Sequence, residues 1–375
     1  MKNLKTYMFV LLLLFPFSGK IFAQKKLDSI LDATIIKIYE NPNAAIETGT
    51  VVFQKANDPK TKVNALMLIS NAYLSKRENE KSLEFALKAR DFLPEIESVK
   101  TRINVLNTIG MQHQQLRIYD KAIEYLDEAL VLVETFEQKD SIYTLLGYNY
   151  AARGFIYREQ MSCDIALNYF DKSIAQYKKG NSNKAKNGNL STLYYNKGNC
   201  FLRATKIDSA RANFEKSIDF AQTVDAKSLY AFAKKGLSEV YTAEGNYAEA
   251  INILKEAEEA SKNVGDLILN QGIYKNLSDN YLAVNNPDLY AIYFEKFNEI
   301  QNQINKKEQK TINNSISNLA AENKAKTESE LSKLQNFRWI LITLIVIVFF
   351  IWGNFILKNL KKYKNSKEKL ETLKR

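Results

Sequence analysis

The sequence predicts an all-α protein: a solenoid of helical hairpins, followed by a helical stalk and one transmembrane helix. Three observations predict this fold. The 375 residues include only 13 Gly and 5 Pro, a composition that suits helices joined by short connections. Small and large residues recur together at intervals of roughly 40 residues, as in repeat architectures. One uncharged apolar run near the C-terminus is long enough to cross a bilayer.

Residues 1–23 predict a secretory signal peptide. Lys2 and Lys5 form a basic start, and Met8–Phe15 is an uninterrupted apolar run. Helix-breaking residues follow, and cleavage after Ala23 would leave a small residue at the peptidase site. An uncleaved anchor is the alternative. No cysteine lies near the predicted cleavage site, which argues against a lipoprotein.

A fixed spacing runs through the body of the chain. Gly110, Gly154 and Gly198 lie 44 residues apart. Each is followed by an alanine after twelve residues, a large residue after sixteen and a small residue after nineteen. The same spacing fits from Ser238, and in part from Ser70. The positions after the three glycines are Ala122, Leu126 and Ala129, then Ala166, Phe170 and Ser173, then Ala210, Phe214 and Ser217.

The segment Gly236–Ala250 carries the clearest form of this pattern. It has, in order, a leucine, a small residue, a first-helix tyrosine, a turn glycine, a second-helix aromatic residue and an alanine. This resembles the tetratricopeptide repeat, in which each unit is a pair of antiparallel helices. The resemblance implies that small residues lie where helices cross, so that a large ring fits opposite them. The residues equivalent to Tyr241 are Tyr73, His113, Tyr157, Phe201 and Tyr281.

Counting the repeats predicts about seven hairpins within residues 24–300. The anchor positions are 45, 82, 122, 166, 210, 250 and 290, so successive steps are 37 to 44 residues. These steps exceed the ~34 residues of the usual repeat, and we expect longer helices or loops. The first unit (28–55) and the last (266–300) are degenerate, as is typical of capping repeats.

Three further segments complete the predicted organisation. Residues 301–336 are polar with sparse apolar positions, which predicts a helical stalk. The stalk either forms a homodimer with a second copy, as a coiled coil, or stays a solvated or partly disordered helix. Residues 337–357 predict the transmembrane helix, because the uncharged run from Trp339 covers roughly 28 Å, close to the bilayer core. Residues 358–375 form a short basic tail.

The charge distribution predicts membrane topology rather than nucleic-acid binding. The net charge is +11, but residues 1–23 carry +3 and the tail carries +6, which leaves +2 for the body (11 − 3 − 6). We therefore expect no direct contact with nucleic acid. The lysines after the apolar run place the tail in the cytoplasm. With the signal peptide, this predicts a single-pass protein of the bacterial cytoplasmic (inner) membrane whose repeat array is periplasmic.

The sequence contains no recognisable catalytic or metal constellation. His113 is the only histidine, so neither a Ser-His-Asp triad nor a multi-histidine metal site can form. It occupies a position where sister repeats have Tyr or Phe, and we expect a packed ring. No phosphate-binding glycine loop is present. We predict that the protein is not an enzyme and binds no cofactor.

Cys163 and Cys200 are the only two cysteines. Antiparallel stacking would bring the start of one second helix close to the end of the following first helix, so a disulfide is geometrically conceivable. Two buried or half-buried free thiols are the favoured interpretation, and the disulfide is the alternative.

The resemblance also implies a concave groove lined by the first helices, which in this family holds peptides or protein segments. Asparagine side chains can bind an extended backbone, and aromatic rings offer anchors. Asn196, Asn199 and Lys235 partly resemble the carboxylate-holding arrangement of peptide-binding members, and an ordinary polar face is the alternative. The candidate groove residues are Tyr148, Phe155, Arg158, Tyr195, Asn196, Asn199, Arg203, Lys235 and Glu239, with Asn64, Asn71, Asn107 and Met111 earlier in the array.

Two functional hypotheses follow. The first is a membrane-anchored interaction module that binds a protein or peptide on the extracytoplasmic side. The second is the sensory part of a bacterial signalling or transcription regulator, since a repeat array, a stalk, one membrane helix and a basic tail resemble that organisation. The 18 residues after the apolar run are too few for a DNA-binding or histidine-kinase domain. On the second hypothesis the output domain is therefore absent, truncated or supplied by a partner.

Overall fold

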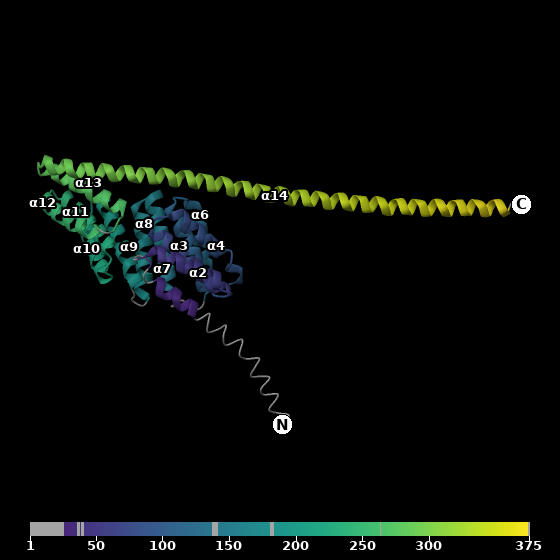
Figure 1. Ribbon diagram of the computed structural model, residues 1–375, viewed down its shortest axis with the longest axis horizontal. Helices are drawn as coiled ribbons and strands as arrows, with labels where there is room; N and C mark the ends of the chain where they lie inside the picture. The colour runs from purple at the N-terminus through teal and green to yellow at the C-terminus, as the bar shows by residue number, and fades with distance from the viewer. Residues whose placement is uncertain are drawn as a thin grey trace, which may run out of the picture. The chain divides into compact units, whose positions relative to one another are not determined.

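The computed structural model describes residues 26–35, 38, 41–136, 142–180, 184–262 and 264–373. The predicted signal peptide lies outside these residues. The described chain is almost entirely helical and contains no strand in the part that the structure describes. It divides into two units, residues 1–306 and 307–375, which we describe separately (Figure 1).

Seven helical hairpins follow one another in the first unit, which confirms the predicted solenoid. Each hairpin has a first and a second helix. In order, they pair residues 26–35 with α2 (Pro42–Lys55), α3 (Pro59–Ser75) with α4 (Asn79–Arg90), α5 (Val99–Gln115) with α6 (Tyr119–Glu134), α7 (Tyr143–Gln160) with α8 (Cys163–Lys179), α9 (Lys184–Arg203) with α10 (Ile207–Thr223), α11 (Lys227–Ala243) with α12 (Tyr247–Ser261), and α13 (Leu267–Ala283) with the start of α14 (Pro287–Leu373). A 3-10 turn, η1 (Leu93–Glu95), follows α4.

The turn between the two helices of a hairpin has one recurring form. The second residue after the first helix has positive φ, and the next backbone N–H donates to the carbonyl of the repeat's ring residue at 2.9 Å. This satisfies carbonyls that the helix end leaves unpaired. The exception is the α7–α8 turn, where Met161 has φ −125°. The residues with positive φ in these turns are Arg77, Arg117, Thr205, Gly245 and Asn285.

The recurring glycines make room for rings of the second helices. A Cβ on Gly154 would lie 2.5 Å from the ring of Phe170, and one on Gly198 would lie 2.6 Å from that of Phe214. Phe214 also lies against Gly236 of the following hairpin, at 2.3 Å from the position of its Cβ. The large residue that needs the small one is therefore the second-helix residue sixteen positions later, and this spacing is what the sequence displays. These rings are fully buried.

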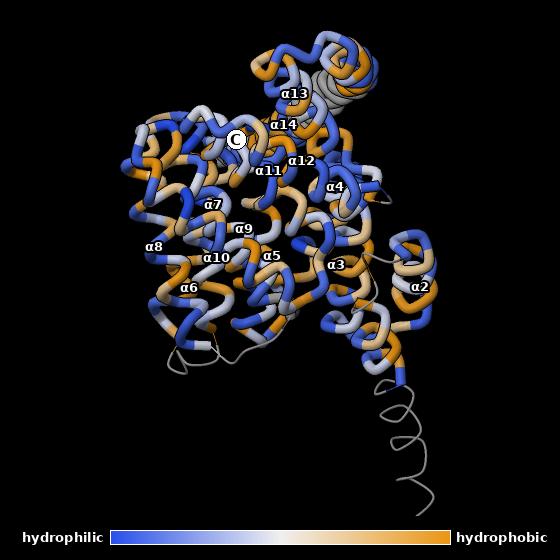
Figure 2. The backbone as a smooth tube through the Cα atoms, turned by 90° about the vertical axis from the view of Figure 1, so that its left-hand side faces the viewer, coloured by the Kyte–Doolittle hydropathy of each residue, from blue (hydrophilic) through white to orange (hydrophobic). Residues whose placement is uncertain are grey.

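At three junctions, successive first helices pack more closely than successive second helices. Direct approaches join α5 with α7, α9 with α11, and α11 with α13, whereas the second helices of neighbouring hairpins make few or none. The array therefore bends with its first helices on the inner side. Along each helix, apolar and polar residues alternate, as expected for elements that bury one face (Figure 2).

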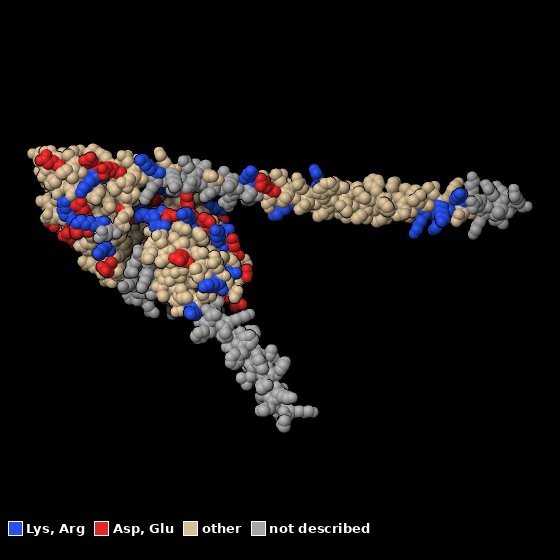
Figure 3. All heavy atoms as spheres, viewed as in Figure 1, with Lys and Arg blue, Asp and Glu red and all other residues tan. Residues whose placement is uncertain are grey.

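The second unit is the rest of α14, which continues without a break to Leu373. The helix therefore shows no boundary at 336 or 357, and the stalk, transmembrane and tail spans stay predictions. Within the described chain, one helical stretch is long and apolar enough to cross a membrane: Thr327–Ser366 of α14. Its large apolar side chains are exposed. Figure 3 shows an uncharged surface in the middle of this stretch, with charged side chains before it and basic side chains after it.

Candidate binding surface on the first helices

Nine of the predicted groove residues lie on three successive first helices, α7, α9 and α11, and the other four lie on α3 and α5. Two clusters form among the nine, one from side chains of α7 and α9 and one from side chains of α9 and α11. The nine residues are Tyr148, Phe155 and Arg158 on α7, Tyr195, Asn196, Asn199 and Arg203 on α9, and Lys235 and Glu239 on α11.

The cluster at α9 and α11 is centred on Lys235. Its ammonium group forms an ion pair with Glu239 at 2.6 Å, and Asn276 of α13 donates to the same carboxylate oxygen at 2.9 Å. Its methylene chain lies against Gly272, where a Cβ would be 2.6 Å from Cε. Only 16 % of the Lys235 side chain is exposed. A cation is thus held in place by one carboxylate and covered by the backbone of the next hairpin.

Burial and the neighbouring acids act in opposite directions on Lys235. Burial lowers the pKa of its ammonium group, but Tyr195 and Glu239 more than offset this and raise the pKa above its ordinary value. Lys235 therefore stays charged across the physiological pH range.

Tyr195 lies beside Lys235 and packs against two aromatic rings. Its ring centroid lies 5.9 Å from that of Phe214 and 5.6 Å from that of Phe232. Asn199 is half-buried and Arg203 exposed one and two turns further along α9, and neither side chain forms a hydrogen bond or ion pair within the described residues. The cluster therefore offers a fixed cation, the half-buried rings of Tyr195 and Phe232, and two unengaged polar side chains.

The cluster at α7 and α9 is more internally satisfied. Arg158 donates to Asn196 and to Glu159, the latter at 2.6 Å, and its guanidinium lies over the Phe155 ring at 6.0 Å. Asn196 is only 5 % exposed and itself donates to the Thr192 carbonyl. These groups hold the two helices together, so Asn196 has little polar surface left for a ligand.

A buried polar ladder lies at α5 and α7, and the sequence analysis missed it. Asn149 donates to Asn107 at 2.7 Å and to the Leu126 carbonyl at 2.9 Å, and Arg153 donates to Asn149 and pairs with Asp127. Asn107, predicted as a groove residue, is buried in this ladder. The ladder carries no sequence signal because its partners come from separate helices.

The remaining candidates are buried or half-buried and lie outside the Lys235 cluster. Met111 is buried, and Tyr148 packs partly into the core cluster that Met111 belongs to. Asn64 and Asn71 are half-buried on α3.

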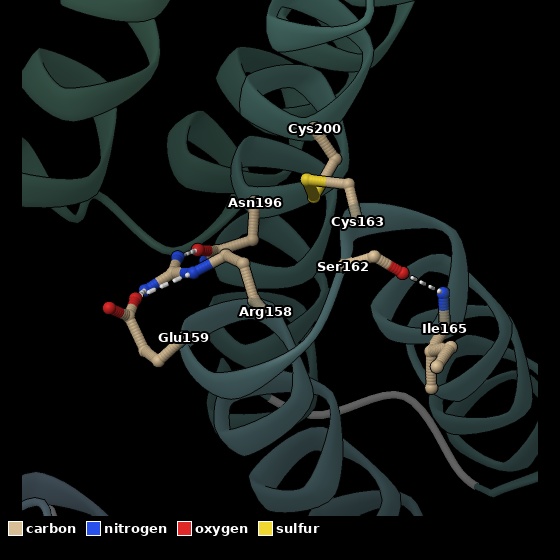
Figure 4. Close-up of a disulfide and its surroundings, with 7 residues drawn as sticks. All are labelled: Arg158, Glu159, Ser162, Cys163, Ile165, Asn196 and Cys200. Atoms are coloured by element: carbon tan, nitrogen blue, oxygen red, sulfur yellow. Dashed lines mark hydrogen bonds and ion pairs between the residues drawn. A yellow bond between two sulfur atoms is a disulfide. The ribbon is translucent and has the colours of Figure 1, made fainter.

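The two cysteines form a disulfide, so the favoured interpretation of free thiols was wrong. Cys163 is the first residue of α8 and Cys200 lies near the end of α9, with a Cα–Cα distance of 5.3 Å (Figure 4). The equivalent positions at other junctions, such as Ile207 and Val240, share an apolar core cluster. Stacking thus brings this pair of positions together at several junctions, and at one of them both residues are cysteine.

His113 is a packed ring, as predicted. It is 8 % exposed, stacks on Tyr125 at a centroid distance of 5.3 Å, and its Nδ1 lies 2.9 Å from the Ile109 carbonyl oxygen. Across the described residues, no group of three or more potential metal ligands comes together.

Comparison with known proteins places the array among helical repeats. Residues 189–263 match the family described as tetratricopeptide repeat. NprR in complex with its cognate peptide NprX is similar at a TM-score of 0.53 and 16% identity, over 72% of this chain and 76% of NprR. A Rap protein complexed with competence and sporulation factor gives 0.51 and 11%, over 69% and 80%.

A third structure is the STAND protein PH0952 from Pyrococcus horikoshii, with a tetratricopeptide repeat sensor. It is similar at a TM-score of 0.55 and 13% identity, over 73% of this chain, and the match spans 41% of that protein. No curated protein sequence matches significantly. At these identities the likeness concerns the fold alone.

Proposed function

We propose that this chain, a tetratricopeptide-type repeat protein, is a membrane-anchored module that binds a peptide or protein segment through its first helices outside the cytoplasm. The single observation that carries this is the Lys235 cluster. A charged, held cation beside the aromatic edge of Tyr195 and the unengaged Asn199 suits a ligand with a carboxylate and an extended backbone. Repeat arrays of this kind typically serve binding rather than catalysis.

The titles of similar structures support a peptide ligand. NprR is described with its cognate peptide and Rap with competence and sporulation factor. Both are similar to this chain in fold, and their ligands suggest the class of partner, not its identity.

The disulfide supports the proposed location of the array outside the cytoplasm, and the apolar part of α14 supports the proposed membrane anchor. Disulfides persist in oxidising compartments outside the cytoplasm, and Cys163–Cys200 lies within the array. The exposed apolar stretch of α14 suits a bilayer, and Lys358, Lys361 and Lys362 after it suit the cytoplasmic side. Pairing of two copies through residues 301–336 remains a prediction.

A sensory role is the second candidate. Similar structures are described as a quorum sensor, NprR from B. thuringiensis, and as a repeat sensor. In this chain the second helix of the last hairpin is the same helix that contains the apolar stretch, α14. A partner in the cytoplasm would then supply the output.

Crosslinking in native membranes followed by mass spectrometry tests the binding role. We expect a polypeptide partner that is lost in Tyr195→Ala/Asn199→Ala and retained in Tyr247→Ala/Asn252→Ala, a matched pair on the second helix α12. Equal loss in both variants, or no partner, would sink the proposal. Protease added outside intact spheroplasts should digest the array and leave the tail intact, and the reverse result would exclude the proposed topology.

A further inference from the structure

One contact joins hairpins that are far apart in the array. Arg77, in the α3–α4 turn of the second hairpin, forms an ion pair with Asp266 at the start of α13 in the seventh, 189 residues away. Asp266 is 7 % exposed and Arg77 is 57 % exposed. Both lie in the same compact unit. The bend of the array thus brings its second and last hairpins into contact.

The two oxygens of Asp266 have different tasks. Oδ1 caps α13 by accepting from the backbone N–H groups of Ile268 at 3.0 Å and Leu269 at 3.1 Å. Oδ2 accepts from Arg77. Because the cap uses only Oδ1, the contact with Arg77 can break without unwinding the helix. A half-exposed ion pair of this kind is weak and screened by salt.

The junction midway between hairpins 2 and 7 lies between hairpins 4 and 5, and it is built differently. The first helices α7 and α9 make few or no direct approaches there, unlike α5 with α7 or α9 with α11. The first helices α3 and α5 are also apart, but that junction is not midway. At the midway junction the Cys163–Cys200 disulfide and the Arg158–Asn196 hydrogen bond join the two sides.

We propose that the array is a clamp with two jaws, hairpins 2–4 and hairpins 5–7. The junction of hairpins 4 and 5 is its hinge, stapled by the disulfide, and Arg77–Asp266 is the contact that closes it. This rests on the proposed function and specifies its partner. Closed jaws enclose the first helices, so the partner is a flexible polypeptide segment that threads between them rather than the surface of a folded domain.

Distance measurements on the full chain in lipid nanodiscs test the clamp. Spin labels replace Asp91, after α4, and Asp288, in α14, both exposed, and the two native cysteines are engaged in the disulfide. We expect one narrow distance distribution at low salt. Arg77→Glu and Asp266→Asn should each lengthen and broaden it, as should high salt; the asparagine retains the cap.

The matched control is Arg117→Glu. Arg117 occupies the same turn position one hairpin later, also has positive φ, and forms no ion pair within the described residues. It should leave the distances unchanged. Unchanged distances in Arg77→Glu, or an equal change in Arg117→Glu, would overturn the closing contact.

The hinge is tested by Cys163→Ser/Cys200→Ser with maleimide-linked labels at the same two sites. We expect a broader distribution, broadest when combined with Arg77→Glu. A distribution identical to that of the parent would overturn the hinge.

Mapping the crosslinked positions on the partner tests its class. Crosslinks should fall in termini or linkers, and crosslinks confined to a folded domain would overturn the threaded partner. If a partner crosslinks while Arg77→Glu leaves the distances unchanged, the clamp fails and the binding role stands. If the distances respond and no partner crosslinks, the binding role fails and the clamp stands.

Discussion

The fifth and the seventh hairpins place the same ring in opposite environments. Phe214 is fully buried, between Gly198 of its own hairpin and Gly236 of the next. Phe294, at the equivalent position of the last hairpin, is 43% exposed. The difference is that α14 continues unbroken to Leu373, so within the described residues no further first helix packs against Phe294. The successor of a hairpin therefore contributes to burying its second helix, as expected of a solenoid whose stability is summed over neighbours.

The last hairpin shares an apolar core cluster with its predecessor, and polar groups also join the two. Glu258 of α12 accepts from the Tyr293 hydroxyl at 3.1 Å and pairs with Lys296 at 3.4 Å, and Lys255 forms an ion pair with it at 3.0 Å. Within the described residues the last hairpin has no following hairpin to pack against it, and the charged cluster around Glu258 contributes to joining it to the sixth hairpin.

The largest expected effect contrasts the two rings directly. Phe214→Ala should lower the free energy of unfolding by about 3–5 kcal/mol, because it leaves a cavity between two hairpins. Phe294→Ala should lower it by about 1 kcal/mol or less, because the ring is partly in solvent. Urea unfolding of the full chain in detergent, followed by circular dichroism, measures both. Equal losses would contradict the argument that burial by the next hairpin makes the two rings differ.

Removing the disulfide should have the next largest effect. The bond closes a loop of sequence separation 37, so Cys163→Ser/Cys200→Ser should lower the free energy of unfolding by about 2–4 kcal/mol. Reductant should destabilise the parent protein by a similar amount and leave the variant unchanged. A reductant effect of the same size in both would show that the loss has another origin.

Gly236→Ala tests the packing of Phe214 against the following hairpin. Its Cβ would lie 2.3 Å from Phe214, so the ring must shift, and we expect a loss of about 1–3 kcal/mol. Gly188→Ala is the control, because its Cβ would meet nothing closer than 3.7 Å. Thermal unfolding of the two variants in parallel decides this. Equal stability of the two variants would contradict the packing argument.

The smallest expected effect is a pH dependence at the array's end. Burial raises the pKa of Glu258, but Lys255, Lys296 and Tyr293 more than offset this and hold it below the ordinary 4.5. A carboxyl with a depressed pKa stabilises the fold above its unfolded pKa, and this is lost as pH falls through the folded pKa. The protection of the first turns of α14 against hydrogen exchange should therefore fall below about pH 4.5, and Glu258→Gln should show less of this fall.

Much of the fold could be predicted because its determinants are local. The spacing of Gly154 and Phe170 is a contact within one hairpin, so the sequence displays it directly. The ring equivalents of Tyr241 mark the turns, since their carbonyls accept the closing hydrogen bonds. Candidate site residues were harder to predict: Lys235 and Tyr195 come together, whereas Asn196 and Asn107 are buried in contacts between helices.

The hairpins, their number and the apolar stretch of α14 can be predicted from the sequence, because each depends on residues within a few helical turns of one another. The disulfide between Cys163 and Cys200 and the ion pair between Arg77 and Asp266 depend on how the hairpins stack in the tertiary structure. The physical reason is curvature: small rotations at each junction add up along the array, and no local pattern records their sum.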